Sequence, residues 1–273
     1  MFQLLIVLGV IVLAVGLRTF SHPILCKSGA VAVLLATYLA AYFVSDSHVA
    51  GIAGVLMWFL LPWVELLTRI RKLRLPLRKS LHHQSPPNSQ RFPHLGAFTD
   101  EIEELAFDYV EDAGWEWDDL NQFFRLFYHP GERAQAAICL NEQQGLGFVF
   151  VSLTSRTADG RIYRTWNFPF SYTLKVAPEI RINRVANADS FEQLLEEHRD
   201  FLQRMGLTAE DLMVENPEAI PELMEVETQL QIRHNLDRGV ITHDRSDPEK
   251  VRYSWRGLFF LYGQLVKDMV KLS

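Results

Sequence analysis

The hydrophobic and polar positions divide the chain into an apolar first quarter and a mixed remainder. Three stretches carry no Lys, Arg, Asp or Glu, namely residues 2–17, 28–44 and 47–64. At about 1.5 Å per helical residue such stretches cover roughly 24 to 27 Å, close to the ~30 Å hydrocarbon core of a bilayer. The pattern predicts a membrane region over residues 1–68. Its three transmembrane helices are expected at about 2–20, 28–45 and 48–68.

A cleaved signal peptide is the alternative for the first apolar stretch. No basic residue precedes its apolar core, and the segment Leu17-Arg18-Thr19-Phe20 lacks the small residues of a cleavage site. We therefore interpret this stretch as a retained anchor.

Beyond the membrane region the pattern changes twice. Residues 81–96 are rich in Pro, Ser, Asn and Gln without periodicity, which predicts a flexible tether. Apolar residues then recur at helical spacing between Thr99 and Gly114, and a second helix is predicted behind Asp118 or Asp119.

Four runs with the composition of strands follow, and then three further helices. The strands are predicted at 135–140, 146–154, 161–168 and 179–185. The helices are predicted at 189–205, 209–215 and 217–238. Short connections between the strands favour an antiparallel sheet. Residues 97–241 are therefore expected to form an α+β domain in which about four strands are covered by helices.

The last segment, residues 242–273, is expected to form an amphipathic helix. From Trp255 to Leu272, aromatic and aliphatic side chains follow one stripe. The stripe fits packing on the domain and also fits an interfacial contact with a bilayer.

The distribution of charge predicts an orientation in the membrane. Residues 1–80 hold 8 Lys or Arg and 2 Asp or Glu, whereas residues 81–273 hold 19 and 31. The first predicted loop carries Arg18 and Lys27, and the third predicted helix runs into a basic segment at 69–80. Since basic residues favour the cytoplasmic side, the N-terminus is expected outside an inner or plasma membrane and the α+β domain in the cytoplasm.

Six cations of the basic segment are expected to bind anionic lipid headgroups, at about 1 kcal/mol each. They are Arg69, Arg71, Lys72, Arg74, Arg78 and Lys79. The acidic remainder of the chain would be repelled by phosphate, which argues against nucleic acid as a partner.

Small residues recur along the second and third predicted helices and predict close helix packing. They are Ser28, Ala32, Ala36, Ala40, Ala50 and Gly54. This seam serves either packing within one chain or contact with a membrane protein partner or a second copy.

Acidic residues are concentrated between residues 100 and 119, where no Lys or Arg occurs. A solvated helix face is the ordinary interpretation, and docking of a basic protein partner is the functional one. The expected partner-binding residues are Asp100, Glu101, Glu104, Asp108, Glu111, Asp112, Asp118 and Asp119.

Candidate chemistry is confined to the helices after the sheet. His198 shares a helix face with apolar residues, as do Glu227 and His234 on a later helix. If these faces met, two imidazoles and a carboxylate would converge for metal binding or proton transfer. Buried histidines bonded to other protein groups are commoner. No phosphate loop, nucleophile elbow or calcium loop occurs, so neither a metal nor a cofactor is expected.

The sequence favours a membrane-anchored cytosolic protein that serves recognition, as a scaffold or accessory subunit, with no catalysis identified. The alternative is a membrane-bound enzyme that uses His198, Glu227 and His234. A channel or transporter is disfavoured because the predicted helices carry no charged pathway residues.

Overall fold

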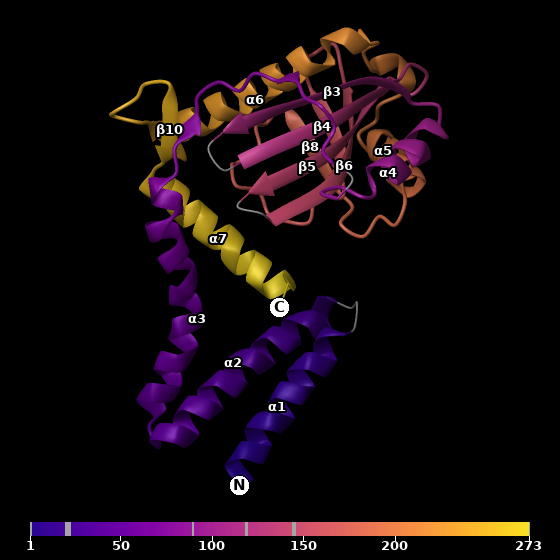
Figure 1. Cartoon of the computed structure of the whole chain (residues 1–273). Helices are drawn as coiled ribbons and strands as arrows, with labels where there is room; N and C mark the ends of the chain where they lie inside the picture. Colours follow the sequence, from indigo (N-terminus) through magenta and orange to yellow (C-terminus); the bar gives the residue numbers. More distant parts are fainter. Residues whose placement is uncertain (1, 20–22, 89, 118–119, 144–145, 273) are drawn as a thin grey trace.

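The computed structural model describes residues 2–19, 23–88, 90–117, 120–143 and 146–272. Three helices form the N-terminal part and stand below the rest of the molecule in Figure 1. They are α1 (Phe2–Arg18), α2 (Pro23–Ser45) and α3 (His48–Thr68). α2 packs against both α1 and α3.

Two helical stretches of the described residues, not the predicted three, are long and apolar enough to cross a membrane. They are Lys27–Ser45, with 19 residues, and His48–Lys72, with 25 residues. The apolar part of α1, Gln3–Leu17, is shorter and at about 1.5 Å per residue reaches only ~22 Å.

Small residues let α2 and α3 approach each other closely. A Cβ on Gly51 would lie 2.6 Å from Cε2 of Tyr38, and a Cβ on Gly54 would meet α2 at 3.2 Å. Trp58 Nε1 also donates a hydrogen bond of 3.0 Å to Thr37 Oγ1. The two helices therefore form a closely packed hairpin.

The large sheet has seven strands in the order β2-β3-β4-β5-β6-β7-β8. The strands are β2 (His82–His83), β3 (Asp108–Trp117), β4 (Leu120–His129), β5 (Ala134–Gln143), β6 (Leu146–Arg156), β7 (Ile162–Trp166) and β8 (Ile180–Arg184). Neighbours are antiparallel except β7 and β8, which are parallel. The α+β class is confirmed, and the four predicted strands correspond to β5–β8. The sheet is larger than expected, however, and mixed.

Helices cover both faces of the large sheet. They are α4 (Leu95–Glu103), α5 (Phe191–Arg204) and α6 (Ile220–Asp237). The short 3-10 helices η2 (Ala209–Asp211) and η3 (Pro217–Ala219) connect α5 to α6. On one face Leu194 of α5 and Leu95 of α4 share a core with Leu153 of the sheet. On the other face Ile220 of α6 shares a core with Leu126.

Two predicted helices between Thr99 and Phe127 are instead β3 and β4, apart from the short α4. Phe123 and Phe127 of β4 enter the core beneath α5. Phe124 and Leu126 enter the core beneath α6. Because both faces of the strand are buried, the alternation of apolar and polar residues is lost, and the remaining spacing imitates a helix.

The predicted tether, residues 81–96, is folded against the large sheet. His82 and His83 form β2 and pair with β3. Phe92 and Leu95 are buried in the core with α5. The pairing of β2 and the burial of Phe92 and Leu95 therefore hold residues 81–96 on the sheet, although their polar composition predicts a flexible segment.

The small sheet has the order β1-β10-β9 and lies beside the end of α3 (Figure 1). Its strands are β1 (Leu75–Pro76), β9 (Ile241–His243) and β10 (Lys250–Tyr253), and α7 (Trp255–Leu272) follows. The C-terminal segment is thus helical only from Trp255 onward. The basic segment contributes η1 (Ile70–Lys72) and β1, so it is built into the fold.

Candidate functional site

The contact between α3 and α7 joins the apolar helices to the rest of the protein. We call it the junction, defined by Trp63 and Leu66 of α3 and by Leu258, Phe259 and Tyr262 of α7. The Trp63 ring lies 5.0 Å from Phe259, edge to face, and 5.1 Å from Tyr262, stacked. Leu66 is 0% exposed and shares a core with Leu258. Each such buried side chain contributes roughly 1.5–3 kcal/mol, so the junction fixes α3 against α7.

Two of the six predicted lipid-binding cations, Arg74 and Lys79, are half-buried against the domain. Arg74 Nε lies 3.1 Å from Asp244 Oδ2, and the Arg74 carbonyl oxygen accepts a 2.9 Å hydrogen bond from Trp117 Nε1. Lys79 Nζ lies 3.8 Å from the centre of the Trp115 ring, and burial lowers the pKa of Lys79 to about 8. These contacts hold the basic segment on the domain.

The other four predicted lipid-binding residues are exposed: Arg69, Arg71, Lys72 and Arg78. Arg71 stacks its guanidinium 4.8 Å from the centre of the Trp255 ring. Arg69 pairs with Glu65 at 3.5 Å, an exposed ion pair of the kind that contributes little. A basic surface therefore remains directly after α3, beside the first turn of α7.

The predicted acidic helix pair is divided between a helix and a strand. Asp112 of β3 is buried and accepts two hydrogen bonds from Arg125, at 2.8 and 2.7 Å. Glu101 of α4 accepts a hydrogen bond from the backbone nitrogen of Phe191. Glu111 is half-buried, and three members are exposed: Asp100, Glu104 and Asp108. Asp118 and Asp119 lie outside the described residues.

His198 of α5 is buried on the side of the helix that faces the sheet, and both of its ring nitrogens form hydrogen bonds. Its Nε2 lies 3.1 Å from Ser155 Oγ, and its Nδ1 lies 2.9 Å from Thr165 Oγ1. Burial lowers the pKa of His198 to about 4, so the imidazole is neutral at pH 7. Two hydroxyl groups and the apolar core account for this histidine as a structural residue.

Glu227 belongs to a buried network of four charges. Arg156 donates to Glu227, and it also donates to both carboxylate oxygens of Glu215 at 2.8 and 2.9 Å. Arg164 donates to the second oxygen of Glu227. Burial alone would raise the pKa of Glu227, but Arg164 and Arg156 outweigh it and hold that pKa below its usual value. The two arginines and two glutamates neutralise one another inside the protein.

The sheet separates His198 from Glu227. His198 bonds to Ser155 and Glu227 to Arg156, which is the next residue of β6, and successive side chains of a strand point to opposite faces. His234 lies seven residues after Glu227 on α6, about 10 Å further along the helix axis. The predicted convergence of the three side chains is therefore wrong. Among the described residues no three His, Cys, Asp or Glu side chains are placed to hold a metal ion.

The seam of small residues is largely occupied within the chain. Ala32 and Ala36 of α2 are buried, and Gly54 of α3 packs on α2. The other members are half-buried or exposed: Ala40, Ala50 and Ser28. Packing of the helices on one another accounts for the central part of the seam.

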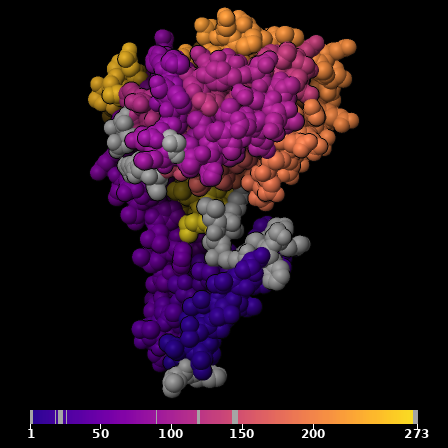
Figure 2. Space-filling view, turned by 45° about the vertical axis from the view of Figure 1, so that its right-hand side comes forward, coloured from indigo at the N-terminus to yellow at the C-terminus, as the bar shows by residue number. Residues whose placement is uncertain are grey.

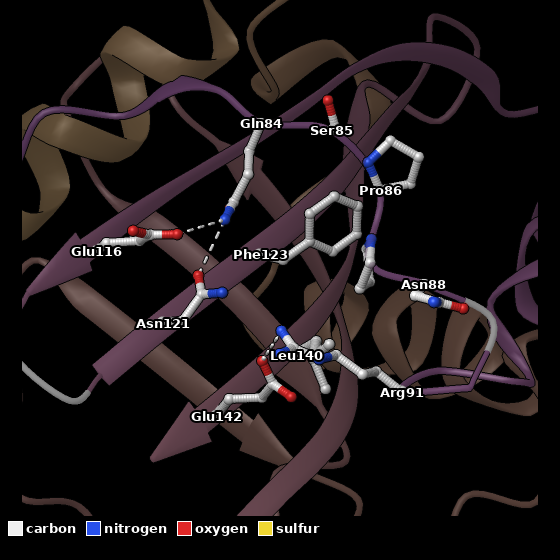
Figure 3. A pocket seen from close by; sticks show the side chains of 11 residues that line it. Gln84, Ser85, Pro86, Asn88, Arg91, Glu116, Asn121, Phe123, Leu140 and Glu142 are labelled. Atoms are coloured by element: carbon white, nitrogen blue, oxygen red, sulfur yellow. Dashed lines mark hydrogen bonds and ion pairs between the residues drawn. The ribbon is translucent and has the colours of Figure 1, made fainter. Parts of the chain in front are cut away.

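A polar pocket of about 270 Å³ lies where the segment predicted as a tether passes the ends of β3, β4 and β5 (Figure 3). Phe123 and Leu140 form an apolar part of its lining. Arg91 approaches Glu142 at 3.6 Å across the pocket. Gln84 Nε2 donates to Asn121 Oδ1 at 3.0 Å and lies 3.5 Å from Glu116 Oε1. The pocket has the size of a small polar molecule, and most of its polar groups already bond to one another.

Sequence reasoning missed both the pocket and the network of four charges. The pocket depends on residues 84–91, which the composition predicted to be flexible, so nothing local pointed to it. The network had one visible signal: Arg156 ends a strand of apolar residues and small hydroxyls, a position that buries its side chain. A buried arginine requires a buried carboxylate, but the sequence does not show that Glu215 and Glu227 are its partners.

Comparison of the chain with protein-family models, with curated protein sequences and with solved structures finds no match. Functional inference therefore depends on the geometry of the junction, the exposed charges and the buried polar groups.

Proposed function

We propose that this chain is a membrane-anchored recognition protein, a scaffold or accessory subunit, whose α+β domain is held at the cytoplasmic face of an inner or plasma membrane. The junction carries the proposal. An apolar helix of membrane-spanning length ends with Leu66 wholly buried in the same core as the small sheet and α7. The end of this helix is packed into a core, whereas most of its apolar surface is exposed. Such an exposed apolar surface is suited to contact with lipid.

The connection after α3 supports a fixed height above the bilayer. Only residues 69–74 separate α3 from β1, and η1 occupies three of them. Trp117 and Asp244 bind Arg74 within this connection. A domain attached in this way keeps its orientation to the membrane, which suits recognition of a partner that is itself bound to the membrane.

The cations at the helix ends support the proposed orientation. Lys27 in α2 and the exposed Arg69, Arg71 and Lys72 after α3 favour the cytoplasmic side for both ends of the hairpin, and Asp46 then lies outside. α1 adds a third, short span with an external N-terminus, accommodated by local thinning of the bilayer. The exposed cations bind anionic headgroups.

Recognition is favoured over the enzyme alternative by the state of the candidate catalytic groups. Glu227 is bound by Arg156 and Arg164, and both nitrogens of His198 are occupied by hydroxyl groups on the other side of the sheet. Neither side chain offers a free group to a substrate. The exposed acidic residues Asp100, Glu104 and Asp108 provide a surface for a basic partner.

The proposal is tested by membrane fractionation and by reporters fused to the full-length chain. We expect the protein to stay in the membrane fraction at alkaline pH. A reporter that works only in the cytoplasm should be active when fused after Ser273 and inactive when inserted at Asp46, which is the matched control. A reporter that works only outside should give the opposite result. Release at alkaline pH would reject the membrane anchor, and an external C-terminus would reject the orientation.

A further inference from the structure

α7 has one side in the junction and another side that the described residues leave exposed. Phe259 lies at the boundary, because its ring contacts Trp63 while most of its surface is exposed. Leu258 and Leu261 are 1% and 6% exposed and belong to the core shared with α3. Trp255 and Phe259, one turn apart, are 55% and 61% exposed. Two large aromatic side chains on the outer side of a helix are costly in water, so this side is suited to an apolar environment.

The outer side of α7 lies at the level where the apolar helices end. α7 contacts both α3 and α2, and it runs from the end of α3 beneath the large sheet toward the start of α2 (Figure 1). In Figure 2 the atoms of α7, in yellow, are visible between the broad domain and the narrower group of N-terminal helices. Phe259 also touches Trp63, beside the exposed apolar side chains Leu60 and Val64 of α3. The aromatic surface of α7 thus continues the apolar surface of α3.

The charges on α7 are arranged for an anionic surface. Arg256 and Lys267 are exposed, and Arg71 lies over Trp255. Asp268, the acidic residue of α7, faces the domain, where it accepts hydrogen bonds from the Ser171 backbone nitrogen at 3.0 Å and from Ser171 Oγ at 2.5 Å. Exposed aromatic rings flanked by Lys and Arg, with the carboxylate turned inward, are the features of a helix that lies in the headgroup region of a bilayer.

We infer that the outer side of α7, formed by Trp255, Phe259, Arg256 and Lys267, inserts into the boundary between headgroups and acyl chains of an anionic membrane. The inference rests on the proposed membrane anchor and deepens it. α3 provides the attachment, while α7 lies along the membrane surface and prevents the domain from tilting. The occupant of this side is the lipid of the same bilayer that α3 crosses, because the two apolar surfaces are continuous at Trp63 and Phe259.

The test places a fluorescent label at three positions of the full-length protein in vesicles of phosphatidylcholine and phosphatidylglycerol. Labels are attached to Leu56→Cys, Phe259→Cys and Glu192→Cys in a background with Cys26→Ser and Cys139→Ala. Leu56 reports whether α3 lies in lipid, and Glu192, exposed on α5, reports a position in water. We expect nitroxide-labelled lipid to quench the labels at 56 and 259, and aqueous iodide to quench the label at 192.

The outcomes separate the inference from the proposed function. A label at 259 that iodide quenches as fully as the label at 192, while lipid quenches the label at 56, overturns the inference and leaves the anchor. A label at 56 that lipid does not quench overturns the anchor and the inference together. A label at 259 that is shielded from both quenchers shows a protein occupant, such as a second copy, and overturns the assignment to lipid.

The anionic character of the surface has its own control. Lipid quenching at 259 should be weaker in vesicles of phosphatidylcholine alone, and the double change Arg256→Gln and Lys267→Gln should remove this difference between the two vesicle types. Equal quenching of the unchanged protein in both vesicle types would overturn the preference for anionic lipid.

Discussion

The cores of the junction and of the large sheet share α6, but, in the part of the chain that the structure describes, only the core of the junction contains residues of α3. The cores on the two faces of the large sheet contain residues of α4, α5 and α6 but, among the described residues, none of α1 to α3. The core of the junction takes Leu66 from α3, a helix of membrane-spanning length. Since a core closes only when its members are present, the small sheet and α7 depend on α3, whereas the large sheet does not. The difference teaches that only part of the α+β region is built onto α3.

The largest effect is expected in the large sheet, from Arg156→Met. This change leaves Glu215 and Glu227 buried with Arg164 as the remaining cation, and loss of one partner of a buried ion pair costs about 3–5 kcal/mol. Thermal unfolding of the full-length protein in mild detergent measures the loss, and attachment to the membrane should not change. Arg161→Met, in an exposed pair with Asp159, is the control and should change the stability far less, because water screens exposed ion pairs. Equal effects of the two changes would contradict a buried network.

The next effect should be confined to the junction, from Leu66→Ala. Removal of a wholly buried leucine costs about 2–5 kcal/mol, and the loss should appear as faster hydrogen exchange in α7 and β10, with β4 to β6 unchanged. The neighbouring Leu67, 40% exposed, is the matched control, and Leu67→Ala should leave the exchange of α7 unchanged. Faster exchange throughout the large sheet after Leu66→Ala would remove the distinction between the two cores.

The sequence predicts the helices that keep a helical period or a long apolar run, and the strands whose composition is that of a strand. The first group contains α2, α3, α5 and α6, and the second contains β5 to β8. β5 and β6 are buried on both faces like β4, but their composition still indicates strands. β3 and β4 do not follow from the sequence, because their apolar residues recur at helical spacing. Residues 81–96 were mistaken for a tether because Phe92 and Leu95 find their partners only in the complete fold.

The candidate site was less predictable than the fold because its geometry depends on distant residues. The sequence places His198 and Glu227 on apolar faces of two helices, and in the structure both side chains are buried. Their separation by the sheet depends on whether each binds Ser155 or Arg156, neighbours that point in opposite directions. The aromatic stripe from Trp255 was visible in the sequence, but which of its residues enter the junction was not.

A smaller effect, dependent on pH, should appear on the α5 side of the large sheet. The pKa of His198 is lowered by burial from 6.5 to about 4, so the unfolded chain binds the proton more tightly than the fold does. Stability that is present above pH 6.5 is therefore lost as the pH falls toward 4, by about 3 kcal/mol in total. Unfolding of the full-length protein between pH 7 and 4 measures it. His198→Gln should have a shallower pH dependence in this range, and a slope identical to that of the unchanged protein would contradict the assignment.

The smallest effect on stability, and one on binding alone, is expected from the exposed acidic surface. The triple change Asp100→Asn, Glu104→Gln and Asp108→Asn alters side chains that are exposed, so the free energy of unfolding should stay within about 0.5 kcal/mol. Basic proteins that copurify with the full-length chain in mild detergent should be lost, because removal of three charges weakens electrostatic complementarity. The matched control is Glu218→Gln, Glu222→Gln and Asp237→Asn, three exposed acids of η3 and α6. If both triple variants retain the same partners, recognition takes place on another surface, and the proposed role of the large sheet in partner binding is wrong.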